Sequence, residues 1–138
     1  MNVLVIVLFF AGHVMPRNIS FSITTEQVLN RTKTVTRRAG WERLKIGEIL
    51  NGCKKCMGLQ PGEKIERLCK IRVTALRREK LRAMTDAPEY GFRETALEGF
   101  PAGDPKHDPA EFVAMFCRSH SGVTPESTIT RIEFEYVD

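Results

Sequence analysis

Three residues in one short run carry groups that can work together chemically. Lys33, Thr36 and Arg38 lie in the run Val28-Leu-Asn-Arg-Thr-Lys-Thr-Val-Thr-Arg-Arg38. A threonine hydroxyl becomes a useful nucleophile when a neighbouring base takes its proton, and a lysine desolvated beside arginines has its neutral, basic form favoured. Arginine offers a fixed fork of donors to a phosphate, a carboxylate or a developing oxyanion. The run therefore predicts a site for a nucleotide or another small polar substrate.

The elements around this run set where its side chains point. The segment 18–23 alternates apolar and polar residues, as a half-buried strand does. Thr24 has the character of a helix N-cap, and Gln27 three residues later completes a capping box for a short helix over 25–32. The β-branched residues that follow favour a strand, so Lys33 is expected at a helix–strand junction. Thr36 and Arg38, two residues apart on that strand, are expected on one face.

A carboxylate is the partner that this group lacks. Glu98 lies at the end of a predicted helical region over 82–98, before a glycine, and Glu94 lies four residues earlier on the same helix face. A buried glutamate near Lys33 can hold the ammonium or relay protons. From the spacing alone, an ordinary solvent-facing helix carboxylate is the favoured interpretation of Glu98.

The rest of the chain predicts a small α+β domain. The strand over 67–76 is expected to point Cys69, Ile71, Val73 and Ala75 inward, and Asp108-Pro109 predicts the start of another helix. The last strand, over 130–137, alternates in the same way, and Arg131 is expected to point outward. There is no βαβαβ rhythm and no internal repeat. A small mixed β-barrel with short flanking helices fits this order best.

Length and charge fit a single domain with an anionic partner. The chain has 138 residues, a net charge of +4 and an isoelectric point near 9.0. Residues 31–45 hold six lysines or arginines against one glutamate, and residues 64–82 hold eight against two acids. Such clusters suit a phosphate-facing surface. A solvated basic strand face, with threonines chosen for strand propensity, explains them too.

The first residues are read separately from the domain. Met1 to Phe10 are almost wholly apolar, but the run is shorter than the roughly 20 residues that span a bilayer. No positive charge precedes Arg17, as a secretory signal requires. We therefore expect residues 1–14 to be an upstream extension or a mis-assigned start, a domain over 15–138, no membrane association and a cytoplasmic location.

The cysteines leave a metal site as an alternative. Cys53-Lys-Lys-Cys56 and Cys117-Arg-Ser-His120 have the same internal spacing and together offer a Cys₃His zinc set. The second pair, however, falls at the end of a predicted helix rather than in a knuckle. Reduced structural thiols are the favoured interpretation, with no metal and no cofactor.

Several segments together resemble the ASCH domain family of PUA-like β-barrels. These segments are Ile19 to Leu29, Lys33-Thr-Val-Thr-Arg-Arg38, Leu44-Lys-Ile-Gly-Glu48, the strand through Ile71-Arg-Val73, Glu98-Gly-Phe100, and Thr130-Arg-Ile-Glu-Phe134. The resemblance covers nearly all of residues 17–138, and the layout is similar to versions carried by bacteriophages. It implies a PUA-like fold.

One bacterial branch of this superfamily is an amidohydrolase that removes the acetyl group from N4-acetylcytidine. Its site uses a lysine, a threonine three residues later and a glutamate on a later helix. The resemblance therefore implies catalytic roles for Lys33, Thr36 and Glu98. Arg38 would then hold the substrate or the oxyanion, and Glu98 would orient Lys33 or protonate the leaving amine. The Cys53–Gly62 loop, the long stretch after Glu98 and the extra Arg37 depart from that branch.

Two further functions stay open at this stage. PUA-like barrels commonly bind RNA or modified bases, so a non-catalytic RNA-binding module is an alternative. Arg37, Thr34 and Trp41 are further substrate-binding candidates, with Trp41 available for stacking on a base. The other alternative is a phage accessory protein that binds a host partner in the host cytoplasm.

Overall fold

The computed structural model describes residues 15–138. The expectation for residues 1–14 falls outside this range. The strands are β1 (Arg17–Ser20), β2 (Val35–Arg38), β3 (Ile49–Cys53), β4 (Arg67–Lys80) and β5 (Thr128–Tyr136). The helices are α2 (Thr25–Leu29), α3 (Ala83–Asp86), α4 (Pro88–Leu97), the 3₁₀ turn η1 (Pro105–His107) and α5 (Pro109–Ser119). The expected α+β class is confirmed.

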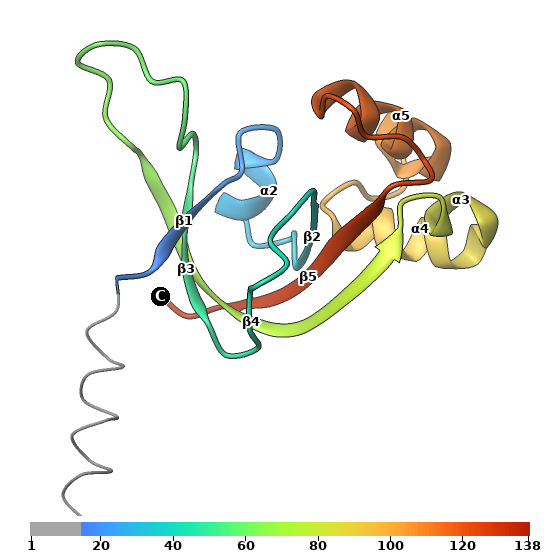
Figure 1. The fold of residues 1–138 in the computed structure, drawn as a ribbon, viewed down its shortest axis with the longest axis horizontal. Coiled ribbons are helices and arrows are strands. Elements are labelled where there is room, and N and C mark those ends of the chain that lie inside the picture. Colours follow the sequence, from blue (N-terminus) through green and yellow to red (C-terminus); the bar gives the residue numbers. More distant parts are fainter. Residues whose placement is uncertain (1–14) are drawn as a thin grey trace, which may run out of the picture.

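The five strands form one curled, mixed sheet in the order β1-β3-β4-β5-β2. β1 runs parallel to β3, and every other neighbouring pair is antiparallel. β4 is long and curved, and a register shift between Val73 and Ala75 bends it (Figure 1). The result is a half-barrel whose two edge strands approach each other. Arg38 of β2 donates from Nη2 to the carbonyl of Ser20 of β1 at 2.6 Å and so links the two edges.

Two hydrophobic clusters hold this architecture together. The first fills the inside of the curled sheet and is centred on Phe21, Leu50, Ile71 and Phe134. The second lies between the end of the sheet and the helices α3 and α5: Leu81, Met84, Phe100, Phe112, Val113, Phe116 and Ile129. The helices α3, α4 and α5 therefore gather at one end of the sheet, while α2 lies at its concave side (Figure 1).

The predicted start of helix α5 is confirmed, whereas the capping predicted for helix α2 is not. α5 begins as predicted, because the side chain of Asp108 accepts a hydrogen bond from the backbone of Ala110. The capping box predicted at Thr24 is wrong, since that side chain makes no capping bond. The neighbouring Thr25 instead donates from its hydroxyl to the carbonyl of Phe21. The helix also ends earlier than predicted, because Arg31 adopts a φ of 62°.

Within residues 15–138, no helix is both long enough and apolar enough to cross a bilayer.

Candidate functional site

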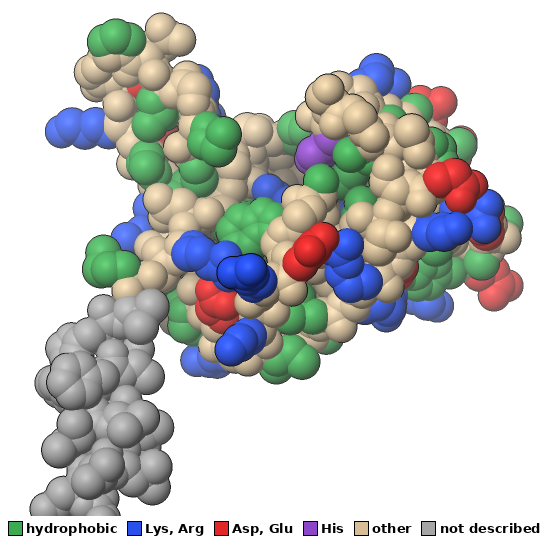
Figure 2. Space-filling view, in the orientation of Figure 1, with side chains coloured by type: hydrophobic (Ala, Val, Ile, Leu, Met, Phe, Trp, Pro, Cys, Tyr) green, Lys and Arg blue, Asp and Glu red, His purple; other side chains and the backbone are tan. Residues whose placement is uncertain are grey.

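A pocket of about 280 Å³ opens between the concave side of the sheet and α5. Its floor is polar and contains Lys33, Thr36, Arg38 and Glu98. Its opposite wall is one face of α5 and is largely aromatic. Figure 2 shows the hollowed face between the helical end and the rest of the sheet. The structure thus brings the sequence-predicted lysine, threonine, arginine and glutamate to a single pocket.

Lys33 and Glu98 form a buried ion pair at this floor. The Nζ atom of Lys33 lies 2.7 Å from Oε1 of Glu98 and 2.8 Å from the backbone carbonyl of the same residue. Each side chain is only 3% exposed. An ammonium has three donors, so one N–H of Lys33 has no partner among the described residues.

The close approach of two chain segments creates this pair. The backbone of Lys33 follows α2, and its carbonyl accepts a hydrogen bond from the hydroxyl of Tyr136. Gly99 follows Glu98 with a φ of 108°, and a Cβ atom placed there would lie 2.8 Å from Cγ of Gln27. A side chain at position 99 would therefore push the end of α4 away from Lys33.

The environment of Lys33 favours its neutral form. Burial lowers the pKa of Lys33, the ion pair with Glu98 opposes that shift, and the nearby Arg38 and Arg37 add to it. A lowered pKa is what a lysine needs in order to act as a general base, because the base must be neutral when it takes the proton.

Thr36 and Arg38 share one face of β2, as their spacing predicts. Nε of Arg38 donates to Oγ1 of Thr36 at 3.1 Å, so the hydroxyl oxygen is held while its own hydrogen stays available. Burial lowers the pKa of Arg38 to about 10, against the opposing charge of Glu98. Thr36 lines the same pocket as Lys33, but the structure contains no hydrogen bond between the two side chains.

Arg37 also lines the pocket, but glutamates hold its guanidinium. Its Nη1 donates to Oε2 of Glu98 at 3.0 Å, and its Nη2 donates to Glu79 and Glu94. Its side chain is fully buried. Although burial alone opposes the charge, Glu98 and Glu94 raise the pKa of Arg37. The terminal nitrogens are thus engaged with protein carboxylates, so the geometry suits a residue that positions Glu98 better than one that grips a substrate.

The outward orientation predicted for Arg131 is wrong. It is 5% exposed and donates to both carboxylate oxygens of Glu94. In the sheet it pairs with Arg37 on β2 and with Arg77 on β4, so three arginines lie side by side on neighbouring strands. The alternation of β5 could not reveal this, because the strand start is covered on both faces.

Thr34 and Trp41 do not line the main pocket. The backbone of Thr34 bonds to Leu97 and Phe134. Trp41 adopts a φ of 57° and lies beneath the guanidinium of Arg17. It lines a second hollow of about 430 Å³, which shares Ser20, Ser22 and Arg38 with the first.

The four proposed zinc ligands are not gathered. Cys56 borders the second hollow and His120 the first. Within the described part of the chain, no three histidine, cysteine or acidic side chains lie close enough to hold a metal ion. Burial raises the pKa of Cys53 and of Cys69 to about 11 in each case, so both thiols are kept protonated.

The α5 wall is the part of the site that the sequence did not single out. Phe112, Met115, Phe116, Ser119 and His120 are spaced as one face of a helix and line the pocket together. The shared face of Phe112 and Phe116 was visible in the sequence. That this face would border a ligand-sized cavity depends on the loop 99–108, whose path the sequence does not predict.

The curled five-stranded half-barrel with short helices is a fold that solved structures share. A crystal structure of a protein from Enterococcus faecalis V583, described by the family model DUF984, matches with a TM-score of 0.60 and 16% identity, over 91% of this chain and 78% of that one. An ASCH domain from Lactobacillus crispatus JV V101 matches with a TM-score of 0.51 and 10% identity, over 87% and 78%. No family model matches the sequence, and no curated protein is significantly similar to it. The expected PUA-like fold is thereby confirmed.

Proposed function

We propose that the protein recognises a modified nucleoside, free or within RNA, and hydrolyses the acyl amide of an N4-acylated cytidine. The observation that carries this proposal is the buried Lys33–Glu98 pair on the floor of a pocket that also contains the Thr36 hydroxyl. A volume of about 280 Å³ lies just below the usual range of small-molecule sites, roughly 300–1,000 Å³. A small planar ligand is therefore the appropriate class.

The reaction can be written with residues of this pocket alone. Oγ1 of Thr36 attacks the amide carbonyl carbon while neutral Lys33 takes the hydroxyl proton. The resulting oxyanion lies near Arg38, whose guanidinium already contacts Oγ1. Collapse breaks the C–N bond, and Lys33 returns the proton to the leaving exocyclic amine. Water then hydrolyses the threonyl ester and releases acetate.

Glu98 fits the role of a positioning group better than that of an acid. Its Oε1 accepts from Lys33 and its Oε2 from Arg37. Because both carboxylate oxygens already accept hydrogen bonds from protein donors, we assign Glu98 to the orientation of Lys33 rather than to protonation of the amine.

The test is release of cytidine from N4-acetylcytidine by the full-length protein, followed by chromatography. Lys33→Ala and Thr36→Val should each abolish release, and Thr34→Val, directly before the strand and outside the pocket, should leave it within about twofold. Because Lys33 must lose its proton, the rate should rise with pH below the ordinary lysine value of 10.5. Equal release by the wild type and Lys33→Ala would refute the catalytic assignment.

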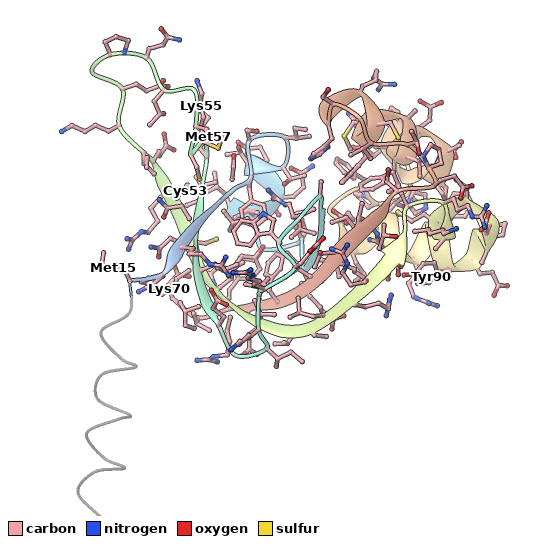
Figure 3. The ribbon with its side chains drawn as sticks, in the orientation of Figure 1. Met15, Cys53, Lys55, Met57, Lys70 and Tyr90 are labelled. Atoms are coloured by element: carbon pink, nitrogen blue, oxygen red, sulfur yellow. The ribbon has the colours of Figure 1, made fainter. Side chains whose placement is uncertain are left out.

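A non-catalytic RNA-binding module is the second candidate. The observation that favours it is the second hollow, which continues the pocket past Arg38 to Trp41 and Lys55. Figure 3 shows Lys55 and Met57 on the long β3–β4 connection that borders this side. An aromatic ring and a lysine suit stacking on a base and contact with a phosphate. Tight, salt-dependent binding of a short RNA without any cytidine release would favour this candidate.

A further inference from the structure

His120 is the residue of the pocket to which neither the proposed reaction nor the fold assigns a function. It caps the C-terminal end of α5 and lines the pocket on the side opposite the polar floor. Its ring stacks on Phe116, with a centroid distance of 4.2 Å and an angle of 16° between the planes. The imidazole is therefore fixed in place before any ligand arrives.

The hydrogen bond of this ring determines which nitrogen is available. Nδ1 lies 2.9 Å from the backbone carbonyl of Phe116. A carbonyl oxygen can only accept, so Nδ1 carries the hydrogen and, in the neutral ring, Nε2 carries the lone pair. No group among residues 15–138 makes a hydrogen bond to Nε2.

The donors on the floor and the acceptor on α5 together restrict which ligands can fit the pocket. Lys33, whose ammonium has one N–H without a partner among the described residues, and Arg38 both line the cavity and offer donors to it. A ligand must therefore offer acceptors, such as a carbonyl oxygen, to the floor. On the α5 side, Nε2 of the neutral ring is an acceptor, to which a ligand must offer an N–H or O–H.

We propose that His120 is a specificity-determining residue, whose Nε2 accepts a hydrogen bond from an N–H or O–H of a planar ligand lying along the α5 wall. The ligand class is a heteroaromatic amide or nucleoside with a carbonyl on one edge and a donor on another. This inference rests on the proposed function, because it takes an acylated nucleoside as the ligand of the pocket.

Three substitutions separate contact with the ligand from a structural role. His120→Asn keeps a donor where Nδ1 lies, so the bond to Phe116 is preserved, but it has no atom at the place of Nε2. His120→Phe keeps the stack and removes both nitrogens. His120→Gln keeps a polar atom near the place of Nε2. If His120 contacts the ligand, the first two should weaken binding about tenfold, the loss of one hydrogen bond, and the third should weaken it less.

The experiment titrates N4-acetylcytidine into the full-length Thr36→Val variant, which cannot turn over, while nitrogen NMR follows the histidine ring and the Lys33 ammonium. We expect an unprotonated Nε2 resonance for His120 that shifts on binding, together with a shift at Lys33. Movement at Lys33 with none at His120, or full binding by His120→Asn, would overturn this inference and leave the proposed function standing. No movement at either residue would overturn both.

Discussion

Arg37 and Arg131 are paired directly across strands β2 and β5, and both guanidinium groups donate hydrogen bonds to Glu94. Like charges placed opposite each other destabilise a sheet. Arg77 extends the row on β4, where Glu79 accepts from it and from Arg37. The carboxylates therefore allow three arginines to lie side by side, and through Arg37 the row reaches Glu98 on the pocket floor.

Glu94→Gln should be among the most destabilising substitutions on α4. It leaves Arg37 and Arg131 buried and facing each other without their shared carboxylate, and removing one partner of a buried ion pair costs about 3–5 kcal/mol. Urea unfolding measures the loss. Glu89→Gln, on the exposed first turn of the same helix, is the control and should change the free energy of unfolding by less than about 0.5 kcal/mol. Equal effects of the two variants would show that the arginine row does not need Glu94.

Lys33 and Glu98 should show strong energetic coupling. Lys33→Met leaves a buried carboxylate with only Arg37 as its partner, and Glu98→Gln leaves a buried ammonium; each should cost about 3 kcal/mol. The double variant removes both charges, so its cost should be well below the sum. A double-mutant cycle by urea unfolding gives the coupling energy. Additive costs would mean that the two side chains have no energetic coupling, which would contradict this prediction.

Gly99 and Gly103 provide a matched pair for the close approach behind the site. Both have positive φ, 108° and 99°, but only at Gly99 would a Cβ atom meet another residue, Gln27. Gly103→Ala should cost only the backbone strain, about 1 kcal/mol. Gly99→Ala should cost about 1–3 kcal/mol more, because Gln27 must move. Thermal unfolding compares the two, and activity should fall only for Gly99→Ala, since the displaced segment carries Glu98.

Much of the fold could be predicted from local sequence patterns, namely strand alternation and helix caps. The alternation of apolar and polar residues predicts that Ile71 and Val73 on β4, and Ile132 and Phe134 on β5, point inward. All four are buried. The proline and cap at Asp108 gave the start of α5. These features depend on neighbours in the sequence, and so a periodic pattern is enough to predict them.

The site was predicted only in part, because its geometry is set by long-range contacts. The spacing within β2 placed Thr36 and Arg38 on one face, whereas the partnership of Lys33 with Glu98 came from resemblance rather than spacing. Arg131 was assigned outward because a strand pattern treats a charge as exposed. Only the helix that covers the strand, and brings Glu94 with it, makes burial of that arginine tolerable.

The stability of the protein in acid should depend on the Glu94 carboxylate. Although burial opposes ionisation, hydrogen bonds from Arg131 and Arg37 lower the pKa of Glu94 below its ordinary value of 4.5, and Tyr90 and Arg77 likewise lower that of Glu79. A depressed pKa in the folded state adds stability that is present above pH 4.5 and is lost as the pH falls through the folded value. The free energy of unfolding of the wild type should therefore decrease steadily below about pH 4.5. In Glu94→Gln the decrease should be shallower, because one linked proton is missing. Urea unfolding from pH 7 to pH 3 tests this, and parallel curves for the two proteins would show that Glu94 does not supply the linkage.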